Sequence, residues 1–145
     1  MTKKKFKKRK ASSYERKPKN LAYKSGKKEQ LIVFSFRDLD RNQGQSFQDW
    51  EDSGLLSNVC EKLVGLSQLT VGEALQQQII KIYTKVEFPP QTSFTYPKHV
   101  AEGVKWASLH IQGKECVIGY FEEHIFQIVF LDKEHEFWKS EKKNT

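Results

Sequence analysis

The chain has 145 residues, of which 37% are hydrophobic and 30% are charged, and its formal net charge is +7. This length suits one folded domain with a short appendage, and no apolar run approaches the roughly 18 residues of a membrane-spanning helix. No apolar segment follows the basic start, so we do not expect a secretory signal peptide. We expect a cytoplasmic protein that makes no membrane contact.

The positive charge is concentrated in the first 28 residues. They hold 13 Lys and Arg against one acid, Glu15, whereas the rest of the chain holds 12 Lys and Arg against 17 acids. A segment with this much charge cannot bury enough apolar surface to offset the conformational entropy that it would lose on folding. We therefore predict a disordered basic arm over 1–29, a folded domain over 30–139 and a polar tail over 140–145. Basic blocks commonly neutralise nucleic-acid phosphates, and the predicted contacts in the arm are Lys3, Lys4, Lys5, Lys7, Lys8, Arg9, Lys10, Arg16, Lys17 and Lys19.

The first half of the domain predicts one strand and two helices. LIVFSF at 31–36 is a β-branched and aromatic run typical of a strand. Apolar residues then recur at helical spacing over about 47–66 and 71–84, with Gly54 weakening the first helix.

Both predicted helices begin with a capping-box pattern. Thr70 and Glu73 have the T-x-x-E spacing in which each side chain bonds the other residue's backbone N–H. Ser46 and Asp49 have the same spacing, with Asp in place of the preferred Glu or Gln. These patterns predict where the two helices start.

The second half predicts a long loop and a three-stranded meander. The loop at 85–103 holds three of the four prolines, and a loop of this length usually serves a function. Apolar segments at about 104–111, 115–121 and 124–131 predict strands joined by tight turns. In the last two segments residues of both parities are apolar, so we expect cover on both sheet faces. Gly119 indicates a bulge or the close approach of another group.

These elements give the order β-α-α-β-β-β. We predict an α+β fold in which two helices pack on a mostly antiparallel, curved sheet, with Trp50 and Trp106 in the core. Cys60 and Cys116 share no CxxC spacing and lie in apolar runs, so we expect reduced, buried thiols. The histidines and cysteines show no metal-ligand spacing, so we predict no metal site and no small-molecule cofactor.

The order of elements and several local features resemble the RelE/ParE-like toxin superfamily. The likeness is best over 104–138, while over 31–84 it extends only to a strand and two helices. The features that carry it are Trp106 in the first strand of the meander, the turn Gln112-Gly113-Lys114, the strand CVIGYF, the acidic hairpin Glu122-Glu123, the strand IFQIVFL, and a tip with His135 and Trp138.

The resemblance implies a toxin directed at RNA or the ribosome, in many members an endoribonuclease, with an antitoxin protein as a partner. Internal RNA cleavage needs a base for the 2′-hydroxyl proton, a cation for the phosphorane charge and an acid for the leaving oxygen. By resemblance, His135 is the acid or base of a metal-independent reaction and Lys114 contacts the phosphate. Trp138 stacks on a base or orients the phosphate, and Lys105 is a further RNA contact.

One position departs from the family pattern. The strand after the first turn often carries an Arg that binds the scissile phosphate, but here Cys116 stands at or beside that position and Glu115 precedes it. A carboxylate repels phosphate, and Lys lacks the bidentate geometry of Arg. An alternative is therefore a non-catalytic module that binds nucleic acid or protein and carries a polycationic tail. A third is a phage-defence or regulatory component that shares only the fold.

Each candidate residue also has a structural interpretation. His135 is then a solvent-exposed turn residue, Lys114 a solubilising turn lysine, and Trp138 a residue that packs against a sheet edge. His110 alternates into a strand and is either structural or part of the site, and His124 heads a strand at the surface.

Overall fold

The computed structural model describes residues 29–83 and 88–139. Nearly all of the predicted basic arm, the polar tail and the start of the Pro-rich loop lie outside these residues. The chain separates into two units, Met1–Gln30 and Leu31–Thr145. Within the described ranges no helix is long and apolar enough to cross a membrane.

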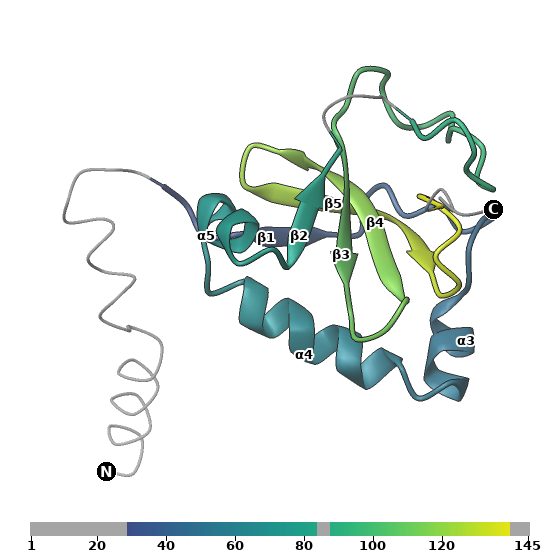
Figure 1. Cartoon of the computed structure of the whole chain (residues 1–145), viewed down its shortest axis with the longest axis horizontal. Helices are drawn as coiled ribbons and strands as arrows, with labels where there is room; N and C mark the ends of the chain where they lie inside the picture. Colours follow the sequence, from purple (N-terminus) through teal and green to yellow (C-terminus); the bar gives the residue numbers. More distant parts are fainter. Residues whose placement is uncertain (1–28, 84–87, 140–145) are drawn as a thin grey trace, which may run out of the picture. The chain divides into compact units, whose positions relative to one another are not determined.

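The second unit is an α+β fold with three helices and a five-stranded sheet among its described residues (Figure 1). The strand order across the sheet is β1-β5-β4-β3-β2, with β1 parallel to β5 and all other neighbours antiparallel. The elements in chain order are β1 (Val33–Ser35), α3 (Phe47–Asp52), α4 (Leu56–Leu66), α5 (Val71–Gln76), β2 (Ile80–Ile82), β3 (Trp106–His110), β4 (Cys116–Glu122) and β5 (Ile125–Asp132).

The predicted three-stranded meander is present as β3, β4 and β5. The predicted bulge is also present, because the β4–β5 register shifts between Ile118 and Gly119. A Cβ atom at Gly119 would lie 2.0 Å from the carbonyl oxygen of Gln127. Only glycine fits this close approach of two backbones.

The first predicted helix is divided into α3 and α4, so the prediction of one helix over 47–66 is wrong. Ser46 forms the predicted capping box at the start of α3. The chain then turns at Gly54, whose φ of 74° is in the left-handed region that favours glycine. Leu55 precedes α4 without a side-chain cap and is buried, so apolar burial rather than capping anchors this start.

The second predicted helix is shorter than expected. The capping box at Thr70 starts α5, but the helix ends at Gln76, and Gln78 follows with a φ of 61°. The next residues form β2, an edge strand antiparallel to β3. The alternation Ile-Lys-Ile suits a strand as well as a helix end, and pairing with β3 decides between them. The prediction therefore missed one strand.

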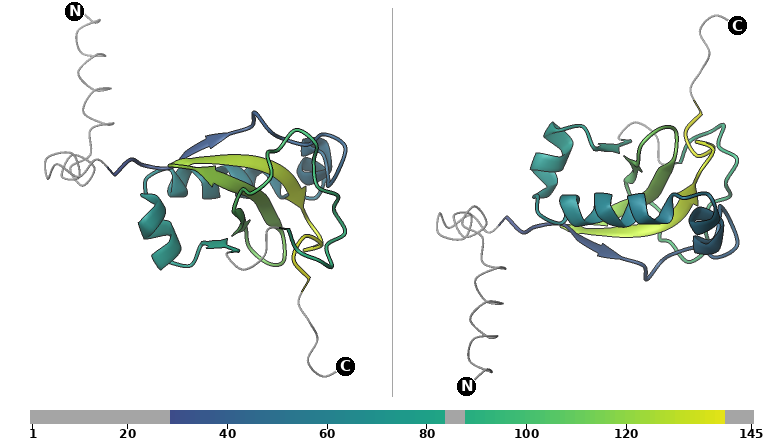
Figure 2. Two further views of the ribbon diagram at one scale, coloured as in Figure 1. Left: turned by 90° about the horizontal axis from the view of Figure 1, so that it is seen from above. Right: turned by 90° about the horizontal axis from the view of Figure 1, so that it is seen from below.

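The sheet separates two apolar layers, which we call the helix face and the loop face. On the helix face the helices pack over side chains such as Leu109 and Ile128. On the loop face residues 88–105 and the chain after β5 pack around Trp106 and Phe130. Figure 2 shows α4 along one face of the sheet and the long loop across the other. The aromatic residues that attach this loop are Phe88, Phe94 and Tyr96.

The two cysteines differ in exposure. Both are free thiols, and Cys116 is buried as expected, but Cys60 is exposed on α4. Residue 60 follows Val59, which faces the core, and one step along a helix rotates a side chain by about 100° toward solvent. The expectation of a buried Cys60 is therefore wrong.

Candidate functional site

Residues 133–138, which we call the tip, reverse the chain after β5. Asp132, at the end of β5, is 1% exposed and accepts hydrogen bonds from the backbone N–H groups of Glu136 (2.8 Å) and Phe137 (2.9 Å). Burial raises the pKa of Asp132. His135 lies inside this reversal with a φ of 61°, a conformation that His adopts more readily than most residues. A buried carboxylate therefore fixes the backbone that presents His135.

The tip brings His135 beside His110. The two ring centroids are 5.7 Å apart. His110 is the last residue of β3 and pairs with Cys116, the first residue of β4. Among the described residues, the histidine ring that makes a hydrogen bond is that of His99. The ring nitrogens of His110 and His135 are therefore available for proton transfer or ligand binding.

The charges of two lysines from other elements act on His110. Partial burial lowers the pKa of His110, and the charges of His135, Lys81 and Lys62 act in the same direction. Lys81 belongs to β2 and Lys62 to α4. A lowered pKa keeps an imidazole neutral near pH 7, the form that accepts a proton.

Trp138 is stacked within the protein. Its ring lies parallel to that of Tyr83, with centroids 4.5 Å apart and planes at 8°. The Tyr83 hydroxyl donates to Ser108 Oγ at 2.8 Å, and Lys81 Nζ lies 5.8 Å from the Tyr83 ring centroid. One face of the indole is therefore covered, as the structural interpretation of this residue expects.

The predicted lysines lie in two places. Lys114 is in the β3–β4 turn, and its Nζ is 2.7 Å from Glu134 Oε1. Hydrogen bonding to Glu134 raises the pKa of Lys114, so a phosphate at this lysine competes with a carboxylate. Lys105 immediately precedes β3, at the opposite end of that strand from His110. The predicted contacts of the basic arm lie outside the described residues.

The carboxylates around the tip have partners of their own. Glu136 accepts from Ser93 Oγ at 2.7 Å, and Glu134 is paired with Lys114. Glu115, which the sequence places beside the expected phosphate position, accepts from the backbone N–H of Gly113 at 3.1 Å. Hydrogen bonds and ion pairs thus offset part of the negative charge at the tip.

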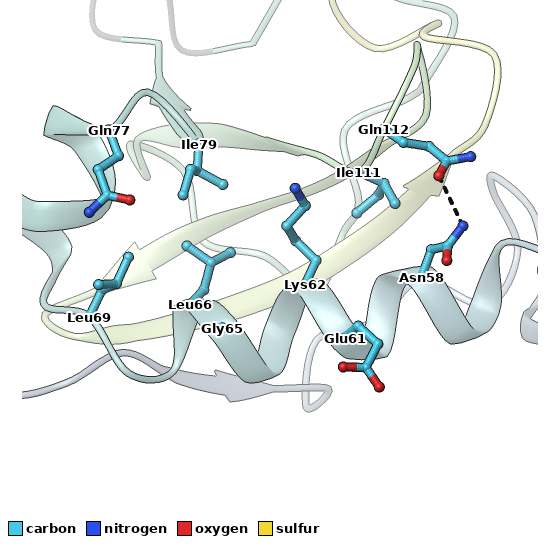
Figure 3. A pocket seen from close by; sticks show the side chains of 10 residues that line it. All are labelled: Asn58, Glu61, Lys62, Gly65, Leu66, Leu69, Gln77, Ile79, Ile111 and Gln112. Atoms are coloured by element: carbon cyan, nitrogen blue, oxygen red, sulfur yellow. Dashed lines mark hydrogen bonds between the residues drawn. The ribbon is translucent and has the colours of Figure 1, made fainter. Parts of the chain in front are cut away.

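A groove of about 500 Å³ lies between α4 and the ends of β2 and β3. Figure 3 shows Lys62 pointing from α4 across the groove toward Ile79 and Ile111. Ile111 directly follows His110 but belongs to the helix-face layer, whereas His110 pairs with Cys116 of the loop-face layer, so the groove and the imidazole pair lie at the same end of β3 on opposite faces of the sheet. The groove is lined by Asn58, Glu61, Lys62, Gly65, Leu66, Leu69, Gln77, Ile79, Ile111 and Gln112.

Cys116 completes the arrangement at this end of the sheet. Its Sγ atom and one ring nitrogen from each of His110 and His135 all lie within 4.8 Å of one another. Burial raises the pKa of the Cys116 thiol to about 12. The linear spacing of these residues is not that of a known metal motif, but one hairpin and one reversal bring them together.

Sequence reasoning missed Lys62, Lys81 and Tyr83. The last two fall in the segment predicted as a helix, and the available signal was the alternation Ile80-Lys81-Ile82-Tyr83, which places both on one face of a strand. The proximity of Lys62 depends on how α4 packs, which no local pattern encodes.

Similarity to known proteins assigns no family to this chain. No protein-family model, no curated protein and no solved structure matches it. A proposal about its function is therefore based on the geometry of the site.

Proposed function

We propose that this chain is an RNA-directed protein of RelE/ParE-like type that cleaves RNA with His110 and His135. The observation that carries the proposal is the pair of imidazoles, 5.7 Å apart between ring centroids, at the partly exposed end of β3. Imidazoles are the commonest general acids and bases in proteins, and each contributes about 10²–10⁴-fold to a reaction rate.

The proposed reaction needs one base and one acid. Neutral His110 takes the proton of a ribose 2′-hydroxyl, and the 2′-oxygen attacks the adjacent phosphorus. The bond from phosphorus to the 5′-oxygen breaks, and protonated His135 gives its proton to that leaving oxygen. The products are a 2′,3′-cyclic phosphate and a 5′-hydroxyl end, and no metal takes part.

Nearby cations suit a phosphate substrate. The positive charges of Lys81 and Lys62 act on His110 and would also act on the charge that builds on the phosphorane. The basic first 28 residues supply sequence-independent attraction to RNA. Lys114 and Trp138, predicted to act on substrate, are assigned here to holding the tip in place.

Three features support the RelE/ParE-like part of the proposal. The last three strands form an antiparallel meander, the helices pack on one face of the sheet, and a tip bearing His follows the final strand. The parallel pairing of β1 with β5, the third helix and the additional strand β2 differ from the expected order β-α-α-β-β-β.

The test is incubation of the purified full chain with RNA and with ribosomes, followed by mapping of the cleaved ends. We expect the wild-type chain to produce 2′,3′-cyclic phosphate ends. We expect the rate of cleavage by His135→Asn to be lower by a factor of about 100 or more. Asn suits this position because it tolerates positive φ. His124→Asn, at the far β4–β5 hairpin, is the matched control and should cleave normally. Equal rates in both variants and the wild type contradict the proposal.

A non-catalytic binding module is the second candidate. It is favoured by the ion pair of Lys114 with Glu134, by the stack of Trp138 on Tyr83, and by Cys116 at the position where an Arg often binds phosphate. This candidate predicts that RNA binding is lost on deletion of residues 1–28, unchanged in His135→Asn, and never followed by cleavage.

An antitoxin partner is part of the first candidate. Exposed apolar side chains suited to protein contact are Val33, Phe36 and Val64. Expression of the chain alone should arrest growth, and His135→Asn should relieve the arrest at equal protein level. Arrest that persists in His135→Asn contradicts a catalytic toxin.

A further inference from the structure

Three side chains with metal-ligating atoms converge at the end of the β3–β4 hairpin. His110 and Cys116 are cross-strand partners, and His135 reaches the same place from the tip. One ring nitrogen of each histidine and the Cys116 Sγ all lie within 4.8 Å of one another. We call these three residues the imidazole–thiol cluster.

Three features of the fold fix the positions of the residues in this cluster. Cys116 is 1% exposed and fixed within β4. Asp132 binds the tip backbone through both carboxylate oxygens, which leaves it to position the tip rather than to bind a ligand. The Lys114–Glu134 pair joins the hairpin turn to the tip. The cluster therefore comes from a built arrangement, and two of its members keep exposed edges that can adjust.

The donor set and spacing suit one kind of ion. Thiolate with imidazole favours Zn²⁺ over Mg²⁺ or Ca²⁺, which prefer oxygen ligands. In a tetrahedral zinc site with bonds of about 2.0–2.3 Å, ligand atoms lie about 3.5 Å apart. Closing from within 4.8 Å to this separation requires only small rotations of the His110 and His135 side chains.

We propose that the imidazole–thiol cluster binds one Zn²⁺ ion through His110, Cys116 and His135, with a fourth position open to water or another ligand. Binding converts the Cys116 thiol to a zinc-bound thiolate and releases its proton to solvent, as zinc binding to cysteine generally does.

Zinc occupancy has a consequence for the proposed reaction. The ion takes a nitrogen from each imidazole that is assigned as acid or base, so the loaded protein should not cleave RNA. Zn²⁺ is then a reversible inhibitor of the site. Only this consequence rests on the proposed function, whereas the binding site stands on geometry and donor chemistry.

The test is titration of the full chain, in reduced form, with Co²⁺ as a spectroscopic probe. We expect one equivalent to bind with the visible bands of a tetrahedral site and a thiolate-to-cobalt charge-transfer band, both removed by Zn²⁺. His135→Asn should weaken binding by about 100-fold or more, since even loss of an outer partner reduces metal affinity by about 10- to 100-fold. Cys116→Ser should abolish the charge-transfer band.

Matched controls are available in the same chain. Cys60→Ser removes the exposed thiol on α4 and His124→Asn removes a distant imidazole, and neither should change the spectrum. If Cys116→Ser does not fold, His135→Asn at the partly exposed tip still decides the question. The absence of tetrahedral bands, or bands that survive His135→Asn, overturns the site.

A cleavage assay with and without Zn²⁺ separates the two proposals. Cobalt binding without RNA cleavage under any condition supports the metal site and contradicts the proposed nuclease. RNA cleavage without cobalt binding supports the nuclease and overturns the metal site. Cleavage that continues with the site loaded with Zn²⁺ contradicts inhibition.

Discussion

Two polar clusters lie at opposite ends of β4 on the loop face, and they differ in how their polar groups are satisfied. One is the imidazole–thiol cluster at the Cys116 end. The other lies at the Tyr120 end, and we call it the Asp38 cluster; it consists of Arg37, Asp38, Tyr120, Glu122 and Gln127.

The members of the Asp38 cluster are joined to one another by hydrogen bonds, and Gln127 Oε1 is its buried side-chain atom that has no partner among the described residues. Asp38 accepts from Arg37 Nε at 3.1 Å and from the Tyr120 hydroxyl. Glu122 accepts from Arg37 at 3.3 Å and from Gln127 at 2.9 Å. The His99 ring reaches the Asp38 backbone oxygen at 2.7 Å and so attaches the long loop. Hydrogen bonding to Arg37 lowers the pKa of Asp38.

The imidazole–thiol cluster is left open by comparison. The hydrogen bond made by a side chain of this cluster, among the described residues, is a long one from Cys116 Sγ to the backbone oxygen of Lys114, at 3.5 Å. A closed cluster of this kind contributes to stability. Titratable groups gathered in an accessible place without mutual satisfaction are typical of functional sites. We therefore expect substitutions at the Cys116 end of β4 to affect chemistry and substitutions at the Tyr120 end to affect folding.

The largest expected effect separates the two clusters by activity. His110→Asn should lower the rate of RNA cleavage by about 100-fold or more, because it removes the proposed base. Tyr120→Phe, in the Asp38 cluster, should leave that rate unchanged. Initial rates on one labelled RNA measure both. A loss of activity in Tyr120→Phe that matches the loss in His110→Asn contradicts the assignment of the chemistry to the imidazole–thiol cluster.

Substitutions in the two clusters should also change the free energy of unfolding by different amounts. Asp38→Ala should lower the free energy of unfolding by about 2–3 kcal/mol, because it leaves the nearly buried Tyr120 hydroxyl and the Arg37 guanidinium without their acceptor. His110→Asn should change it by about 0.5 kcal/mol or less, as an exposed site does. Urea denaturation measures both. Equal losses contradict a division between folding and chemistry.

The stability contribution of Asp38 should also depend on pH. Its folded pKa is lowered below the ordinary 3.8, so its contribution is fully present above that value. The contribution is lost as pH falls through the folded pKa. The gap in unfolding free energy between wild type and Asp38→Ala should therefore narrow from about pH 5 toward about pH 2. A gap that stays constant over this range shows that the carboxylate charge is not involved.

The smallest effect concerns the pair that joins the hairpin to the tip. Glu134→Gln frees Lys114 from an exposed ion pair, and exposed pairs contribute little to stability. We expect no measurable change in the denaturation midpoint and a modest rise in RNA affinity at low salt, which fades as salt increases. A fall in RNA affinity contradicts the assignment of this pair.

Much of the fold could be predicted from the sequence, because the signals for those elements are local. Two capping boxes located the starts of α3 and α5, and Gly119 located the bulge. The division at Gly54 was seen only as a weak point, since the glycine's positive φ depends on how α4 packs. The strand β2 was missed because three residues are too few to distinguish a strand from a helix end without the partner strand.

The site was predictable only in part. His135 was identified from its place in the tip, and His110 faces Cys116 by strand register once the intervening turn is assumed. The reversal that sets His135 against them depends on backbone bonds to the buried Asp132 and on a positive φ. These are tertiary features, so the sequence alone gave neither the imidazole pair nor the thiol beside it.

If His110 and His135 act as one acid–base unit, as we propose, a double-mutant cycle on RNA cleavage will show it. We expect His110→Asn, His135→Asn and the double variant to lose about the same factor in rate, because removing either member of a unit removes its function. Losses that multiply in the double variant, or full activity in either single variant, would contradict the claim.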